Sequence, residues 1–153
     1  MPTIYVETIS VNISKVGFKH FGEEYLYYAK QTKMPRGRFS PVPYFLSCQA
    51  LELLFKAWLS SNGVATAELK NPKKFGHDLA KLFTHSVNLG LGKEVRITKQ
   101  RTDNVRRAHA FYAGDKKFNY WNPRLAFTPT RLPKLPDRQI LHRLGDAIVG
   151  VAR

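Results

Sequence analysis

Apolar residues at helical spacing run through this chain and predict helices over most of its length. The clearest case is the segment 43–61, PYFLSCQALELLFKAWLSS, whose polar residues form one narrow stripe: Gln49, Glu52, Lys56 and Ser60. A helix that is apolar nearly all round is buried on every side. The segment therefore predicts the central helix of an all-α bundle.

The same spacing predicts a bundle of about five helices, over 15–33, from Pro41 or Pro43 to Ser61, over 77–90, about 94–113 and 137–151. Proline is tolerated in the first turn of a helix, so Pro41 or Pro43 can begin the central helix. Asn62-Gly63 is a typical C-terminal end of a helix and sets its other bound. Asp78 in a first turn matches the positive end of a helix dipole, and Asp137 is the expected N-cap of the last helix.

Four aromatic residues of the first helix, Phe18, Phe21, Tyr25 and Tyr28, recur at steps of three and four. Such a stripe more often packs into a core than stacks on nucleobases. We therefore expect it to face the rest of the bundle.

Three segments of more than ten residues fall outside the predicted helices. Residues 1–14 alternate between apolar and polar, as in a short strand or an arm that packs against a partner. Residues 64–76 read as a polar connection. Residues 114–136 contain four prolines and four aromatic residues, which excludes a regular helix and predicts a long loop that packs across the bundle or serves function.

Length and composition favour one globular domain over residues 1–153, since 43% of the residues are hydrophobic. No apolar run reaches the length of a membrane span, and the N-terminus lacks the pattern of a signal peptide. The single Cys48 rules out an internal disulfide and lies among apolar positions, where we expect it to pack in the core. A cytoplasmic protein is the interpretation that these features favour.

The charge is far from neutral. There are 25 Lys and Arg residues against 11 Asp and Glu, for a net charge of +14. Most of the excess lies between residues 93 and 143, which hold thirteen basic and four acidic residues. Such a balance attracts polyanions, among which nucleic acid is the usual one, although net charge alone also serves solubility.

Several kinds of site are missing from the sequence. There is no Gly-rich phosphate loop, no HExxH and no GxSxG motif. One cysteine and five scattered histidines do not have the spacing of a structural zinc site, and we expect neither a metal nor a cofactor.

Glu52 and Lys56 stand at i and i+4 in the order that favours an ion pair, and we expect a buried or half-buried pair that fixes how the helices associate.

The second and third helices resemble the HEPN superfamily (higher eukaryote and prokaryote nucleotide-binding domain). The matching positions are Ala50, Glu52, Leu53, Lys56 and Ala57, followed by His77, Asp78, Leu79 and Leu82. The later KKFNYWNP, residues 116–123, resembles an aromatic-Arg-Tyr-Pro segment of some members, with Asn119 in place of the arginine. The resemblance implies a HEPN-like bundle, homodimerisation, and a setting in a bacterial toxin–antitoxin, defence or stress system.

Many HEPN proteins are metal-independent ribonucleases, whose site carries an arginine, four to six residues, and a histidine. Here seven residues separate Arg101 from His109, and the other arginine–histidine spacings also miss the motif. On a helix the two side chains would lie about two turns apart and roughly 80° around the axis. His109 is expected to be a half-buried helix residue or a contact to a nucleic-acid backbone, and the hypothesis of catalysis by Arg101 and His109 stays as an alternative.

A basic surface with interleaved aromatic residues is the expected contact with nucleic acid, since cations neutralise phosphates and rings stack on bases. Its members are Arg96, Lys99, Arg106, Arg107, Lys116, Lys117, Tyr120, Trp121 and Arg124.

Three hypotheses follow. The favoured one is a non-catalytic HEPN-like protein that binds RNA or a nucleotide, or docks an antitoxin-like or other acidic protein. The alternatives are the metal-independent ribonuclease and a purely structural or interaction protein. We favour binding over catalysis, because the spacing of the arginine and the histidine departs from the nuclease motif.

Overall fold

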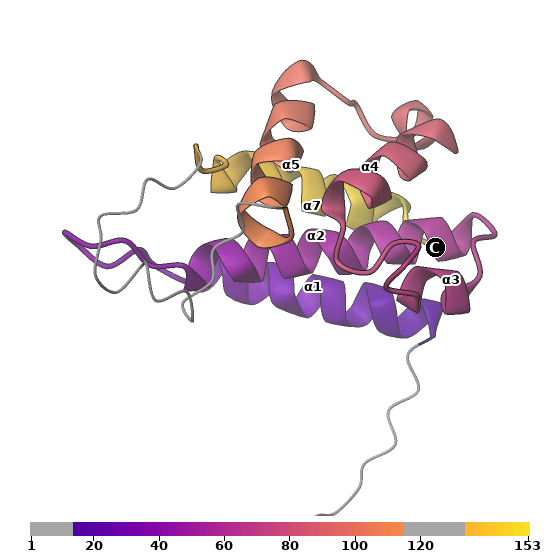
Figure 1. The fold of residues 1–153 in the computed structure, drawn as a ribbon, viewed down its shortest axis with the longest axis horizontal. Coiled ribbons are helices and arrows are strands. Elements are labelled where there is room, and N and C mark those ends of the chain that lie inside the picture. Colours follow the sequence, from indigo (N-terminus) through magenta and orange to yellow (C-terminus); the bar gives the residue numbers. More distant parts are fainter. Residues whose placement is uncertain (1–13, 115–133) are drawn as a thin grey trace, which may run out of the picture.

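The fold is built around one long buried helix, as the sequence predicts. The structure, a computed structural model, describes residues 14–114 and 134–153, and in these ranges it is helical and has no strand (Figure 1). In chain order the elements are α1 (Lys15–Gln31), α2 (Val42–Ser61), α3 (Thr66–Lys70), α4 (Leu79–Asn88), the 3₁₀ turn η1 (Leu91–Lys93), α5 (Lys99–Tyr112) and α7 (Arg138–Val151). The expected all-α bundle is thereby confirmed.

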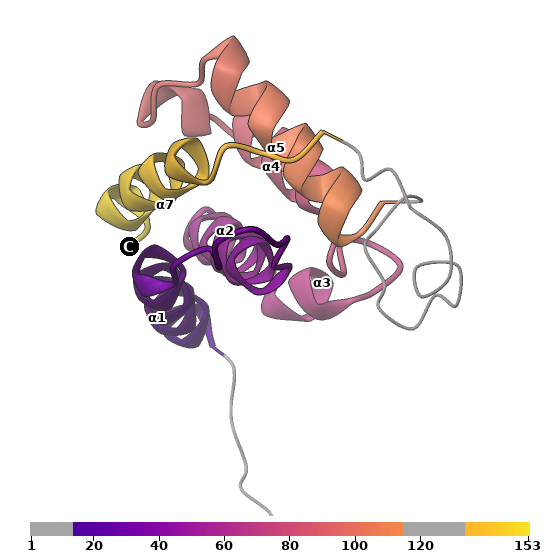
Figure 2. The ribbon, with the colours of Figure 1, turned by 90° about the vertical axis from the view of Figure 1, so that its left-hand side faces the viewer.

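Helix α2 lies in the middle of the other helices. Figure 2 shows it nearly end-on, with α1 on one side, α7 on a second, and α4 and α5 crossing over a third. Twelve of its residues are buried, among them Cys48 and Trp58, which confirms the expected core position of the cysteine. Burial also raises the pKa of the Cys48 thiol, so it remains protonated and apolar in character.

Small residues let α1 and α7 approach the core closely. Gly22 of α1 faces Leu54 of α2 so closely that an added Cβ would stand 2.9 Å from the leucine side chain. Gly145 of α7 faces Leu26 in the same way, with 3.0 Å to an added Cβ. Side chains at these two positions would force the three helices apart, since interiors are packed without spare volume.

The expected aromatic stripe of α1 is wrong in part. Phe18 is buried, but Tyr25 is 38% exposed and Tyr28 is 54% exposed. The buried line of this helix instead passes through Phe18, Gly22, Leu26 and Ala29. The small residues of that line let α1 lie close to α2. As a result, the tyrosines lie at the edge of the interface between α1 and α2.

Three of the predicted boundaries need correction. The polar connection 64–76 contains the short helix α3. Helix α4 begins at Leu79 and not at His77, because Asp78 is its N-cap and its Oδ1 accepts a hydrogen bond of 2.8 Å from the backbone N–H of Lys81. Helix α5 begins at residue 99, five positions later than predicted, because Thr98 is its N-cap and its hydroxyl accepts a hydrogen bond of 3.1 Å from the backbone N–H of Arg101.

The last helix matches its prediction. Asp137 is the N-cap of α7, and its Oδ1 accepts hydrogen bonds from the backbone N–H groups of Gln139 (2.8 Å) and Ile140 (3.3 Å). The backbone N–H of Asp137 in turn donates to Oδ1 of Asn104 on α5, at 2.6 Å. This side-chain contact ties the start of α7 to the middle of α5.

Two predictions concern segments outside the described residues: the N-terminal arm at residues 1–14, apart from Ser14, and most of the Pro-rich loop at residues 114–136. Ser14 itself is the N-cap of α1. Across 14–114 and 134–153, every helix is too short or too polar to cross a bilayer.

The close approach of α1 to α2 leads to a first prediction. Gly22→Ala should lower the free energy of unfolding by about 1–3 kcal/mol, because the new methyl group overpacks against Leu54. Urea denaturation monitored by circular dichroism measures the change.

Gly150→Ala on α7 is the matched control, since nothing lies within 4 Å of an added Cβ there. It should leave stability unchanged or raise it by about 0.4–1 kcal/mol through the lower entropy of the unfolded chain. Equal effects of the two substitutions would show that the α1–α2 contact is not close-packed.

Candidate functional site

The carboxylate of Glu52 is the centre of a buried polar cluster on α2. Its side chain is 2% exposed, and it accepts hydrogen bonds from three groups. Lys56 Nζ lies 2.6 Å from Oε1, the hydroxyl of Tyr112 lies 2.7 Å from Oε2, and Nδ1 of His77 lies 2.9 Å from Oε2. The predicted ion pair between Glu52 and Lys56 is therefore present and buried.

The cluster joins segments that are far apart in the sequence. Tyr112 ends α5, and His77 lies in the turn before α4, so the Glu52 carboxylate connects both of these to α2. The Tyr112 hydroxyl also contacts Oε1 of Gln49, one turn earlier on α2. Burial, followed by the negative charge of Glu52, raises the pKa of Tyr112 above its ordinary value and keeps its hydroxyl a donor.

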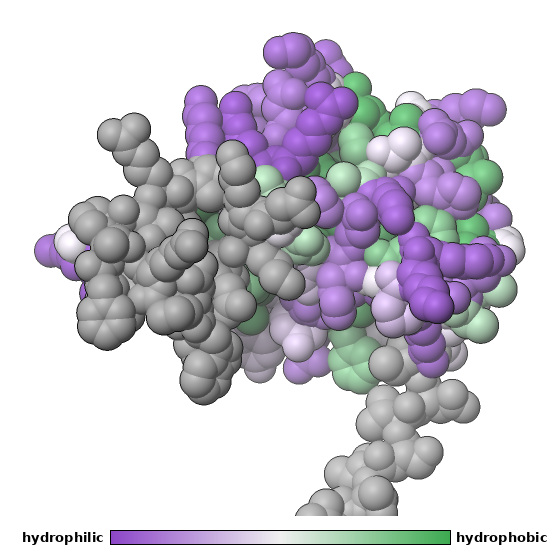
Figure 3. Space-filling model, viewed as in Figure 1, coloured by the Kyte–Doolittle hydropathy of each residue, from purple (hydrophilic) through white to green (hydrophobic). Residues whose placement is uncertain are grey.

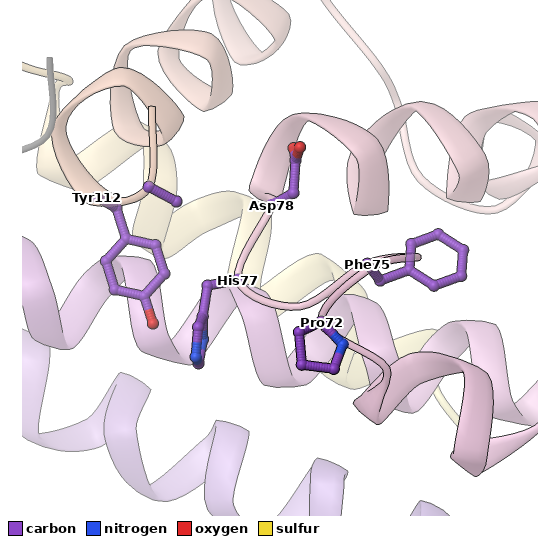
Figure 4. A pocket seen from close by; sticks show the side chains of 6 residues that line it. Pro72, Phe75, His77, Asp78 and Tyr112 are labelled. Carbon is purple, nitrogen blue, oxygen red and sulfur yellow. The ribbon is translucent and has the colours of Figure 1, made fainter. Parts of the chain in front are cut away.

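His77 lines an open cavity, and its Nε2 makes no hydrogen bond within residues 14–114 and 134–153. An ionised carboxylate only accepts hydrogen bonds, so the contact with Glu52 places the proton of neutral His77 on Nδ1 and leaves Nε2 as an acceptor. The imidazole is 73% exposed and lines a cavity of about 460 Å³ (Figure 4). The cavity's other lining residues are Pro72, Phe75, Asp78, Tyr112 and Ala113.

A second cavity, of about 390 Å³, lies between α4 and α5 and shares Phe75 and Asp78 with the first. Its remaining lining residues are Ala80, Lys81, Thr84, His85, Asn88 and His109. The ring of His85 lies 5.3 Å from that of Phe75, between centroids. We call the two adjoining cavities the His77 cavity and the His109 cavity.

His109 and Asp78 both line the His109 cavity and lie close to each other. Its Nδ1 is buried and lies 3.4 Å from Oδ1 of Asp78, an ion-pair distance when the imidazole is protonated. Within the described residues this nitrogen makes no hydrogen bond. Asp78 therefore caps α4 and also places a carboxylate beside His109.

The sequence-predicted catalytic pair is not brought together. Arg101 Nη1 donates to the backbone oxygen of Arg96 at 2.6 Å, at the start of α5. His109 lies eight residues later, which is about 12 Å along a helix axis. In this arrangement Arg101 and His109 contact different groups, and Asp78 rather than Arg101 is the charged neighbour of the imidazole.

Arg138 and His142, which are separated by three residues on α7, hold that helix against its neighbours. His142 Nε2 lies 2.9 Å from the hydroxyl of Ser47, and Arg138 Nη2 donates to the backbone oxygens of Ala29 (2.7 Å) and Thr32 (3.0 Å). Burial, and then the charges of Arg138 and Lys30, lower the pKa of His142 to about 4. A neutral His142 thus links α7 to α2, while Arg138 links α7 to the end of α1.

Four members of the predicted nucleic-acid surface are described. Arg96, Lys99 and Arg106 are exposed, and Arg107 is half-buried. One carboxylate, Asp103, lies near two of them, at 3.4 Å from Lys99 and 4.0 Å from Arg106. The other predicted members lie outside the described residues: Lys116, Lys117, Tyr120, Trp121 and Arg124.

Two features of the site escaped the sequence prediction. His77 was expected only to start a helix, whereas it binds Glu52, which is 25 positions earlier. Lys81 and His85 were not singled out, although they line the His109 cavity. Their i, i+4 spacing on α4 is the signal that could have placed them on one face.

The site contains no metal centre in the part of the chain that the structure describes. There, no three His, Cys, Asp or Glu side chains gather closely enough to hold an ion. Comparison of the chain with family models, curated proteins and solved structures found no match.

The burial of the Glu52–Lys56 pair leads to a second prediction. Lys56→Met should lower the free energy of unfolding by about 3 kcal/mol, because it leaves a buried carboxylate without its cation. Chemical denaturation of the purified variant measures the loss.

The double variant Glu52→Gln/Lys56→Met separates charge from packing. It should lose less stability than Lys56→Met alone, since the uncompensated charge is gone. If the double variant were less stable than Lys56→Met, the loss of stability could not come from an unpaired charge on Glu52.

Proposed function

We propose that this protein binds single-stranded RNA along the His109 cavity and the exposed face of α5, without cleaving it. The observation that carries the proposal is the set of groups at this cavity. Lys81, His85 and His109 line it, and Arg106 stands one turn before His109 on the same side of α5. Cationic and imidazole side chains are the groups that hold a phosphate backbone, and Phe75 adds a ring for stacking.

The charge of these elements supports an anionic ligand. Residues 79–112 contain seven Lys and Arg residues and two acidic residues, a formal charge of +5. Figure 3 shows hydrophilic side chains gathered over α5. The ion pairs of Asp103 with Lys99 and Arg106 are long and exposed, so both cations stay available to a ligand at little cost.

The HEPN resemblance supports the same ligand class. It also supports the proposal of a homodimer in a bacterial toxin–antitoxin, defence or stress system, where an antitoxin-like or other acidic protein would be the natural partner. A binding role fits the chain better than catalysis, because Arg101 is occupied by the Arg96 carbonyl group and lies about two turns from His109.

The third prediction concerns Arg106. The affinity for a short unstructured RNA should fall by about tenfold or more between 50 and 200 mM salt, through the release of counterions. Arg106→Gln should weaken binding at low salt and reduce the slope of log affinity against log salt by about one. Fluorescence anisotropy of a labelled RNA gives both quantities.

Lys15→Gln is the matched control, since it removes one positive charge from α1, which α2 separates from α5 (Figure 2). It should change neither the affinity nor the slope appreciably. Equal effects of the two substitutions would mean that net charge alone, rather than the face of α5, attracts the RNA.

The same RNA, end-labelled and incubated with the protein in EDTA, tests the ribonuclease alternative on a denaturing gel. The proposal predicts intact RNA. Cleavage that disappears in His109→Ala would instead establish His109 as part of a metal-independent nuclease and overturn the non-catalytic role.

A further inference from the structure

The His77 cavity differs in chemistry from the His109 cavity beside it. No lysine or arginine is among its described lining residues, which include Asp78 and the acceptor Nε2 of His77. The walls are otherwise rings and apolar groups: Pro72, Phe75, Tyr112 and Ala113.

These groups suit a flat ligand that carries hydrogen-bond donors. The cavity measures about 460 Å³, within the range of pockets that hold small organic molecules. The rings of His77 and Tyr112 lie 6.1 Å apart, between centroids, and are nearly perpendicular. Figure 4 shows both directed toward α2, where Glu52 holds them.

We infer that the His77 cavity takes one unstacked nucleobase of the bound strand and favours a base with an exocyclic amino group. The inference rests on the proposed function, since the strand must lie along the His109 cavity to place a base next to it. The two cavities share Phe75 and Asp78, so a backbone held at Lys81 and His109 passes the opening of the His77 cavity. RNA recognition commonly uses such splayed bases on aromatic side chains.

The preference follows from the fixed tautomer of His77. With Nδ1–H donated to Glu52, neutral His77 offers only an acceptor at Nε2, and Nε2 has no partner in the described part of the chain. Cytosine presents an N4 amino group where uracil presents an O4 acceptor. An acceptor facing an acceptor leaves both unpaired, so the cavity discriminates against uracil.

The test compares oligocytidylate and oligouridylate of equal length by anisotropy at neutral pH. We expect oligocytidylate to bind about threefold to tenfold more tightly, the range of one net hydrogen bond. His77→Phe keeps a ring at an exposed position and removes the nitrogen, so it should bring the two affinities together while binding persists.

His20→Phe is the matched control, since it makes the same change at an exposed position of α1, outside both cavities, and it should keep both the binding and the preference for cytosine. Equal binding of the two oligonucleotides by the unaltered protein, or a preference that survives His77→Phe, would overturn the base pocket and leave the RNA-binding proposal standing. Failure of both oligonucleotides to bind at low salt would overturn the RNA-binding proposal itself.

Discussion

A carboxylate buried in a helical bundle must be paired, and Glu52 meets this requirement with partners from three parts of the chain. Lys56 comes from its own helix, Tyr112 from the end of α5, and His77 from the turn before α4. An unpaired charge at 2% exposure would cost several kcal/mol. The contacts that satisfy this one side chain therefore hold the end of α5 and the turn before α4 against α2.

The two cavities follow from this arrangement. The turn at residues 71–78 is held against α2 through His77, so it stands beside the end of α5 and leaves open space lined by Phe75, His77 and Tyr112. Asp78, the next residue, caps α4 and directs that helix along the second cavity, where it faces His109. The same contacts that stabilise the bundle thus fix the tautomer of His77 and orient the groups that we propose to meet RNA.

Local chemistry explains why much of the fold could be predicted from the sequence. The all-round apolar pattern of 43–61 specified a central helix, and Asp137 specified the start of α7, because both signals depend on neighbours in sequence. The prediction that the aromatic stripe of α1 faces the core was wrong in part. The spacing of the aromatic residues suits a core, but the contact with α2 is made by Gly22, which lies close to Leu54. A pattern of hydrophobic residues does not reveal such a close approach.

The candidate site was harder to predict, since it depends on contacts between distant segments. The Glu52–Lys56 pair is local and was foreseen, whereas its extension to His77 and Tyr112 spans 25 and 60 positions. The alternative of a catalytic pair, Arg101 and His109, rested on the resemblance to the HEPN motif and on helical geometry. The observed partners of these residues, Arg96 and Asp78, come from the turn before α5 and from the start of α4.

We propose that RNA occupies the cavities between α4, α5 and the turn before α4. Titration of the ¹⁵N-labelled protein with a short RNA, followed by amide chemical shifts in NMR spectra, tests it most directly. We expect the largest changes at Lys81, His85, Arg106 and His109, with α1 and α7 little affected. Changes centred on the exposed tyrosines of α1, or no changes at low salt, would contradict it.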